Sequence, residues 1–391
     1  MKKLVFILLV LGVAASCSPQ NTTTLEDHSD LSSSATANCY VLKEAGEFHF
    51  DGTIKGNGSY IDGLTKNIGL STGNASLIWE SSKGMITNIS FDGIDIHFTY
   101  DGTKGNALIG ALDNNGNIIW SWHLWAPKEE IVLLQSKSGY TVQSMNLGAL
   151  RSELSGESDT DVYGLLYQWG RKDPFPSSPT LTGTVSTTGF PVFDAEGQAV
   201  SIDHSSWTSC EDNTVEYAVA HPTICLSNYA QYSNSKDWLK ESESNDSLWG
   251  DTKTIYDPCP VGYKVPSADV FKTFTSNGQY SEDVSSFDIA DINADGSTDI
   301  SDFKYGWHFN MKDGYSFFPA AARYDGSYAM LMGSKSGLWG SYWANSVAPD
   351  AYYKGTAEIA LSFSCESTLI CASPSASASK ADAYSIRCIK E

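Results

Sequence analysis

Apolar and polar residues alternate along two stretches in the first third of the chain. In residues 86–100, ITNISFDGIDIHFTY, the alternation lies on both sides of Asp92-Gly93, and residues 107–125 repeat it around Asn114–Asn117. A period of two is typical of half-buried strands, and a Gly-containing turn between two such runs indicates a hairpin. The pattern therefore predicts an antiparallel β-sandwich over residues 38–130.

Four tryptophans belong to this first segment: Trp79, Trp120, Trp122 and Trp125. An indole can stack on a sugar ring, or it can fill a core. The alternation favours the core interpretation, and the sugar-stacking alternative stays open at this point.

Residues 131–391 predict a second domain that is long and rich in loops. Residues 176–235 are rich in Ser, Thr and Gly and contain few apolar runs, as surface loops do. Residues 268–274 form a helix-like segment, and residues 357–363 and 383–389 are strand-like. The chain as a whole is predicted to be mainly β, with an α+β C-terminal domain.

The N-terminus has the pattern of a lipoprotein leader. Two lysines precede the apolar run Leu4–Ala15, which is too short to span a bilayer comfortably. Small residues then lead to Cys17, so residues 1–16 are interpreted as a signal peptide and Cys17 as the lipidated first residue of the mature chain. An ordinary signal peptide with a coincidental cysteine is the alternative. Residues 17–37 are small and polar and predict a flexible tether to an outer-membrane lipid anchor.

The net charge limits the possible partners. The chain carries a formal charge of −21 and has a pI of about 4.6. Nucleic-acid phosphates repel such a chain, so we expect no nucleic-acid partner. Acidity of this kind suits a soluble exterior or a calcium-binding protein.

Export makes disulfides plausible, and one pairing stands out. Cys259 lies between two prolines in residues 253–267, KTIYDPCPVGYKVPS, and Cys388 lies in the last strand-like run. We expect a bond between them that ties the start of the helix-like segment to the end of the chain. Local bridges Cys365–Cys371 and Cys210–Cys225 are further candidates, which leaves Cys39 as a buried free thiol.

A candidate calcium loop spans residues 291–302, DINADGSTDISD. Calcium takes six to eight oxygen ligands, and a 12-residue loop supplies them at set positions, with glycine at position 6. Here Gly296 occupies that position, although an acidic surface turn is the alternative. The expected ligands are Asp291, Asn293, Asp295, Asp299 and Asp302 through side chains and Ser297 through its carbonyl.

Enzyme signatures are missing from the sequence. It contains no GxSxG, no HExxH, no phosphate loop and no GxGxxG that opens a helix, and no two of its seven histidines have metal-ligand spacing. We therefore expect a non-enzyme. Three of the four arginines, Arg171, Arg323 and Arg387, are expected to form buried structural ion pairs with carboxylates, with contact to a ligand carboxylate or sugar as the alternative.

Six separated motifs resemble one family. NLGA (146–149), YQWGRKDPF (167–175), IYDPCPVGYKVPS, FFPAAAR, GLWGSYW and the terminal SIRC are similar to the Fibrobacter succinogenes major paralogous domain. The first segment resembles a module that precedes this domain in Bacteroidetes surface lipoproteins, some of them fimbrial or adhesin-like. The resemblance implies a C-type lectin-like fold for residues 131–391. The chain has no Glu-Pro-Asn or Gln-Pro-Asp triplet, so the resemblance does not imply calcium-dependent sugar binding.

Two functions follow as expectations. The first is an adhesin-like, surface-exposed lipoprotein that presents the lectin-like domain to a glycan or to a host or bacterial surface protein. The second is a fimbrial subunit. Shaft subunits that resemble this chain are cut after arginine or lysine near the first strand, and here the first such residue after Cys17 is Lys43, inside a strand-like run. That position leaves an anchor or tip role among fimbrial subunits.

Overall fold

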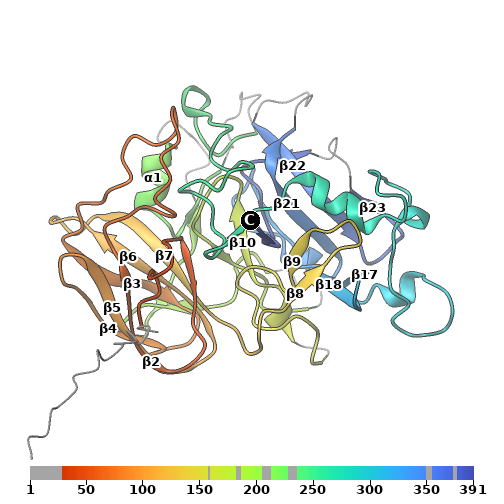
Figure 1. The fold of residues 1–391 in the computed structure, drawn as a ribbon, viewed down its shortest axis with the longest axis horizontal. Helices are drawn as coiled ribbons and strands as arrows, with labels where there is room; N and C mark the ends of the chain where they lie inside the picture. The colour runs from red at the N-terminus through yellow and green to blue at the C-terminus, as the bar shows by residue number, and fades with distance from the viewer. Residues whose placement is uncertain are drawn as a thin grey trace, which may run out of the picture.

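The computed structural model describes residues 29–156, 159–181, 186–204, 213–227, 236–348, 355–372 and 377–391. The fold is mainly β, as predicted. The strands of the first segment lie on one side of the molecule and the C-terminal strands on the other, with β10 (Leu165–Gln168) between them (Figure 1). Among the described residues, no helix is both long and apolar enough to cross a membrane.

Two sheets build the first segment. The predicted hairpins are confirmed: β4 (Ile86–Phe91) pairs with β5 (Asp95–Tyr100), and β6 (Gly105–Leu112) with β7 (Ile118–Ala126). The three-stranded sheet has the order β2-β5-β4, and the six-stranded sheet has the order β1-β7-β6-β3-β12-β13. The remaining bounds are β1 (Cys39–Val41), β2 (Gly46–Asp51), β3 (Asn74–Glu80), β12 (Val192–Phe193) and β13 (Ala199–Val200).

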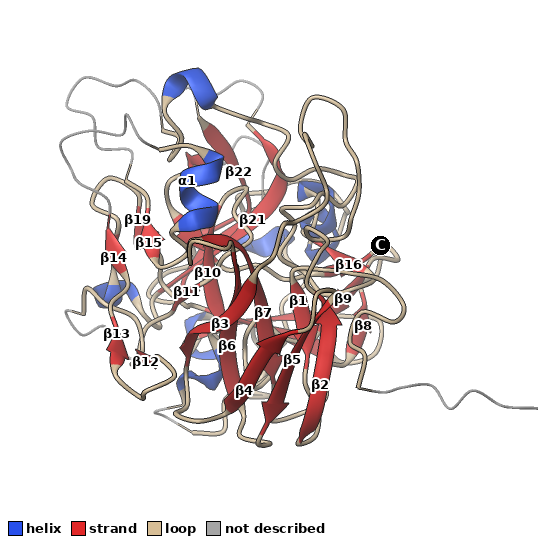
Figure 2. Ribbon diagram, turned by 90° about the vertical axis from the view of Figure 1, so that its left-hand side faces the viewer, coloured by secondary structure: helices blue, strands red, loops and turns tan. Residues whose placement is uncertain are grey.

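Alternation buries one face of the three-stranded sheet, whereas β6 and β7 of the six-stranded sheet are buried on both faces. In β5, Ile96, Phe98 and Tyr100 are buried, and the polar residues between them are more exposed. Figure 2 shows the three-stranded sheet beside the six-stranded sheet. The two sheets share one hydrophobic cluster, in which the ring centres of Phe50 and Trp122 are 5.1 Å apart. The four tryptophans of the segment, Trp79, Trp120, Trp122 and Trp125, are at most 1% exposed, which confirms the core interpretation.

Short strands dominate the rest of the chain. A five-stranded sheet has the order β11-β10-β25-β19-β20, with β11 (Phe175–Pro176), β25 (Ala383–Tyr384), β19 (Tyr324–Asp325) and β20 (Met330–Leu331). A four-stranded sheet has the order β16-β26-β9-β8, with β16 (Tyr263–Lys264), β26 (Ile389–Lys390), β9 (Thr141–Gln143) and β8 (Leu133–Gln135). Two ladders have two strands each: β17 (Gly306–Asn310) with β18 (Tyr315–Pro319), and β14 (Asp203–His204) with β15 (Ile224–Cys225).

The last sheet begins within the GLWGSYW motif, residues 337–343. It consists of β21 (Trp339–Val347), β22 (Thr356–Ser364), β23 (Ile370–Cys371) and β24 (Ser377–Ser379). The one α-helix described, α1, spans Val215–Ala220, and the Thr214 side chain caps it by accepting from the Tyr217 amide. The helix-like segment is a 3-10 helix, Ala268–Phe274; further 3-10 turns are Thr160–Val162, Glu241–Glu243, Val284–Ser286, Ile300–Asp302 and Gly333–Lys335.

The two predicted domains share structure across residue 130. Phe193 of β12 pairs with Glu80 of β3, so the second segment extends a sheet of the first. One hydrophobic cluster also joins Trp79 and Trp125 to Leu147 and Tyr384. Separate unfolding of the two segments would have to break this shared core.

Candidate ligand-binding site

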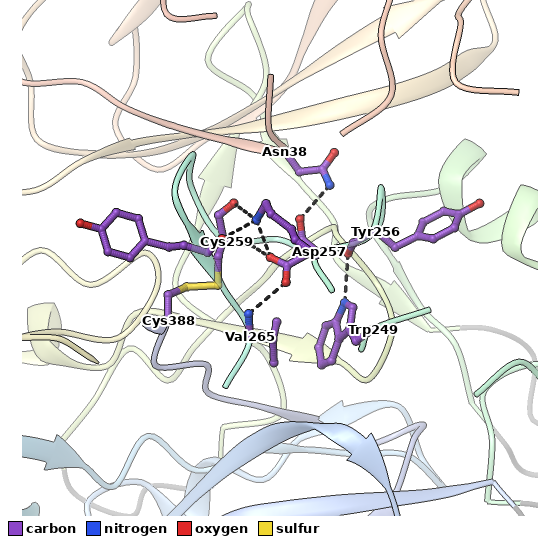
Figure 3. The surroundings of a disulfide bond; sticks show 9 residues. Asn38, Trp249, Tyr256, Asp257, Cys259, Val265 and Cys388 are labelled. Atoms are coloured by element: carbon purple, nitrogen blue, oxygen red, sulfur yellow. Dashed lines mark hydrogen bonds and ion pairs between the residues drawn. A yellow bond between two sulfur atoms is a disulfide. The ribbon is translucent and has the colours of Figure 1, made fainter. Parts of the chain in front are cut away.

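The motif around Cys259 forms a buried junction (Figure 3). The structure joins Cys259 to Cys388, the predicted partners, with an S–S distance of 2.05 Å. The Asp257 carboxylate accepts from the amides of Cys259 and Val265 at 2.8 and 2.9 Å. The Cys259 side of the disulfide is therefore held by a turn that folds around one carboxylate.

The first segment is fastened to the same motif. The Asn38 amide donates to the carbonyls of Ile255 and Asp257 at 2.7 and 2.9 Å. Gly56 packs so closely that a Cβ there would lie 2.3 Å from the Ile255 oxygen, and its φ of +52° also favours glycine. This region is scaffolding, because its polar groups are paired with protein groups and buried.

The other cysteine predictions have mixed outcomes. Cys365 and Cys371 are free thiols, so the candidate local bridge between them is wrong. In the β22–β23 ladder Cys371 lies opposite Ser362, three residues before Cys365, so the two cysteines do not face each other. Cys39 is free and buried, as expected. Cys225, the other half of the candidate bridge to Cys210, is also a free, buried thiol. Cys17 and Cys210 lie outside the described residues.

Two of the three arginines are buried and one is partly exposed. Among the described residues, neither Arg171 nor Arg387 forms the expected ion pair, because their acceptors are carbonyl, amide and hydroxyl oxygens. Arg171 is buried and donates to Gln168 and to the Ile224 carbonyl. Arg387 is buried and donates to Asn146 and, among others, the Phe317 carbonyl. Arg323 differs, because 43% of its side chain is exposed.

The candidate calcium loop folds around two of its carboxylates. Asp291 accepts from the amides of Asp295 and Gly296, and the buried Asp302 accepts from those of Ile292, Asn293 and Asp299. Asp295 accepts from Ser297, and Asp299 from the Ser301 amide. Across the described residues, three acidic or histidine side chains converge within 4.8 Å only at Asp92, Asp95 and His97. The loop contains the oxygen donors that calcium prefers, and calcium binding there stays a prediction.

The exposed Arg323 lines a hollow of about 180 Å³. The lining consists of Ala322, Arg323, Met332, Lys335, Trp339 and Ser341. Trp339, the first residue of β21, is 37% exposed, and the Lys335 ammonium lies 5.6 Å from its ring centre. The hollow thus presents an aromatic face beside two cations in an acidic chain.

Backbone bonds set the shape of this hollow. After β18, the Ala322 amide donates to the Trp339 carbonyl at 3.1 Å, and Ala322 has a φ of +63°. The Met332 amide donates to the Arg323 carbonyl at 2.8 Å. The 3-10 turn Gly333–Lys335 then places Lys335 beside Trp339. Backbone hydrogen bonds therefore fix the main chain that carries the side chains of the hollow.

A hydrogen-bond relay orients Arg323. Its guanidinium donates to the Tyr384 hydroxyl at 3.1 Å, and that hydroxyl donates to the Asp382 carboxylate at 2.8 Å. Asp325 lies 3.5 Å from the same guanidinium. The Tyr384 hydroxyl, together with the carboxylates of Asp382 and Asp325, raises the pKa of Arg323 above its ordinary value, so the guanidinium stays charged. A fixed, charged guanidinium suits recognition of a carboxylate.

Another hollow is larger but less suited to recognition. It measures about 460 Å³ and lies beside Lys55, Trp120 and Glu216. Trp120 is 1% exposed, so its ring face is not offered to a ligand.

The sequence identified only part of the hollow. Arg323 was predicted as a possible ligand contact, whereas Lys335 was not singled out and Trp339 was noted only inside a motif. A tryptophan four residues after a lysine at the start of a strand is the signal that could have found them. Comparison of the chain with family models, curated proteins and solved structures finds no match.

Proposed function

We propose that the chain is a lipid-anchored, adhesin-like binding protein of the outer membrane, exposed at the cell surface. The lipidation pattern at Cys17 supports the anchor, and the six family-like motifs support a C-type lectin-like domain behind an N-terminal β-sandwich. The protein acts by binding and not by catalysis. Its proposed ligand is an acidic glycan, with an acidic protein segment as the other outcome of the test.

The observation that carries this proposal is the exposed Trp339 beside Lys335 and Arg323. An indole face packs against the apolar side of a sugar ring, and the two cations pair with a sugar carboxylate or sulfate. The hollow is smaller than the about 300–1,000 Å³ of typical small-molecule sites. It therefore suits one terminal unit of a larger ligand, without a requirement for calcium.

An array of neutral and acidic glycans and of matrix proteins tests this function. We expect binding to acidic glycans, and a marked loss of signal in a Trp339→Ala variant. Labelling of intact cells with a membrane-impermeant reagent tests surface exposure. Binding of the variant equal to that of the wild type would contradict the site, and absence of labelling would contradict surface display.

One observation favours a second function, an accessory fimbrial subunit that anchors or ends a fibre. The first strand, β1, pairs in parallel with β7 along Cys39–Val41, and the preceding Asn38 is tied to Ile255 and Asp257. A strand held in this way suits a subunit that keeps its first strand. We expect the protein to be isolated from solubilised outer membrane in a complex with fimbrial subunits. Recovery of the protein as a lone monomer would exclude this role.

A further inference from the structure

Polar side chains gather on the outer face of the three-stranded sheet. His97 and Asp95 alternate with the buried Ile96 and Phe98 in β5, so they project away from the core. His49 of β2 lies directly opposite His97 in the ladder, and the two rings stack with centres 5.1 Å apart. The β4–β5 turn adds Asp92 to the same place.

Three of these side chains converge on one point. The potential ligand atoms of Asp92, Asp95 and His97 all lie within 4.8 Å of one another. His97 Nε2 is 3.0 Å from Oδ2 of Asp92. The other oxygen of Asp92 accepts from the amides of Ile94 and Asp95, so the turn itself aims Oδ2 at the histidine.

His49 contacts the carboxylate of Asp95. Its Nδ1 atom lies 3.0 Å from Oδ2 of Asp95. The His49 backbone is fixed on both sides, because it pairs with β5 and also accepts from the Leu31 amide and donates to the Ser29 carbonyl. Histidine–carboxylate pairs of this kind orient metal ligands in proteins.

We propose that Asp92, Asp95 and His97 bind one divalent transition-metal ion of the Zn²⁺ class, and that His49 positions the Asp95 carboxylate. Imidazole nitrogen with two carboxylates suits zinc better than calcium, which prefers oxygen alone. The site is open to solvent, because the side chains of His97 and Asp92 are 41% and 54% exposed. A hollow of about 400 Å³ lies beside His49 and His97, although Asp92 and Asp95 do not line it. A bound ion would clamp the β4–β5 turn to the sheet.

Titration of Zn²⁺ into the purified chain, followed by calorimetry, tests the site. We expect the wild type to bind one more equivalent than the His97→Gln variant. The matched control is Asp113→Asn, because Asp113 caps the β6–β7 turn through the amides of Asn115 and Asn117 with no histidine beside it. That control keeps full stoichiometry, whereas Asp92→Asn loses the equivalent.

Two further measurements keep the test decisive. His49→Phe should retain the stoichiometry and weaken binding about 10–100-fold, as loss of an orienting partner does. In the wild type, Co²⁺ should broaden the imidazole NMR signals of His97 and His49 and leave those of His221 sharp. Equal stoichiometry of wild type and His97→Gln, or no selective broadening, would overturn the proposal.

Discussion

The Nζ atom of Lys253 lies 2.7 Å from Oδ1 of Asp257, with side-chain exposures of only 4% and 2%. The ammonium also donates to the carbonyls of Cys259 and Tyr263 at 2.8 and 2.6 Å. The carboxylate accepts from two backbone amides (Figure 3). Because every group of this pair is satisfied, it can fix the turn that holds Cys259 opposite Cys388.

Removal of the lysine should therefore destabilise the whole fold. Lys253→Met leaves the buried Asp257 charge without its cation, and breaking such a pair typically lowers the free energy of unfolding by about 3–5 kcal/mol. Lys264→Met is the matched control, since its exposed ammonium contacts the Asp251 carbonyl, and a loss below about 0.5 kcal/mol is expected there. Urea unfolding measures both; equal losses in the two variants would contradict this role.

Reduction of the disulfide should lower stability as well. The bond joins residues 129 positions apart, and loss of a native disulfide typically reduces the free energy of unfolding by about 2–5 kcal/mol. A Cys259→Ala/Cys388→Ala variant should melt lower than the wild type and respond little to added reductant. A Cys365→Ala/Cys371→Ala variant is the control, and reductant should lower its melting temperature as it does for the wild type. A control variant that no longer responds to reductant would place the stabilising bridge between Cys365 and Cys371.

Lowering the pH should reduce the free energy of unfolding, because His123 of the first segment is buried in its neutral form. This side chain is fully buried against Asn106 Oδ1, 2.9 Å from its Nε2 atom, and burial lowers its pKa from 6.5 to about 3. Between these two pH values the unfolded chain binds more protons, so stability falls as the pH drops through this window. The slope from this group reaches about 1.4 kcal/mol per pH unit.

The His123→Gln variant isolates that contribution. Its free energy of unfolding, measured by urea titration from pH 8 to pH 4, should fall less steeply below pH 6.5 than that of the wild type. The two slopes should coincide above pH 7.5, which serves as the internal control. Parallel curves over the whole range would show that His123 is not the source.

Calcium binding at residues 291–302 is a separate prediction. Calorimetric titration of calcium into chelator-treated protein should give a binding event that Asp291→Ala/Asp295→Ala removes. Asp283→Ala is a suitable control, because Asp283 caps the turn at Ser285 outside the loop. Retention of the event in the double variant would place calcium elsewhere.

Local patterns in the sequence predict part of the fold. The Asp92-Gly93 turn predicted the β4–β5 hairpin, because a two-residue period and a turn dipeptide are both local signals. The Cys259–Cys388 pair could be predicted from its two well-separated motifs. The hairpin needs only local signals, whereas the disulfide joins residues 129 positions apart and could be predicted because each cysteine lies in a distinctive motif.

The pairing of strands far apart in the sequence could not be predicted. The contact of β12 with β3 joins Phe193 to Glu80, and no period or turn dipeptide encodes it. The same holds for the hollow at Arg323 and Trp339, which requires the turn after β18 to meet the start of β21. The group at Asp92, Asp95 and His97 depends on a hairpin turn that was predicted, but its partner His49 comes from another strand.

Affinity for an acidic glycan is the measurement that tests the proposed function most directly. Calorimetry should compare the wild type with Trp339→Ala, Arg323→Gln and Tyr384→Phe, the last of which removes only the hydroxyl that orients Arg323. Ser334→Ala, an exposed change in the neighbouring 3-10 turn, is the control. We expect at least about tenfold weaker binding for Trp339→Ala and Arg323→Gln, a loss of about 1.4 kcal/mol or more, a smaller loss for Tyr384→Phe, and no change for the control. Binding that is equal in all variants would contradict the assignment of this hollow as the ligand site.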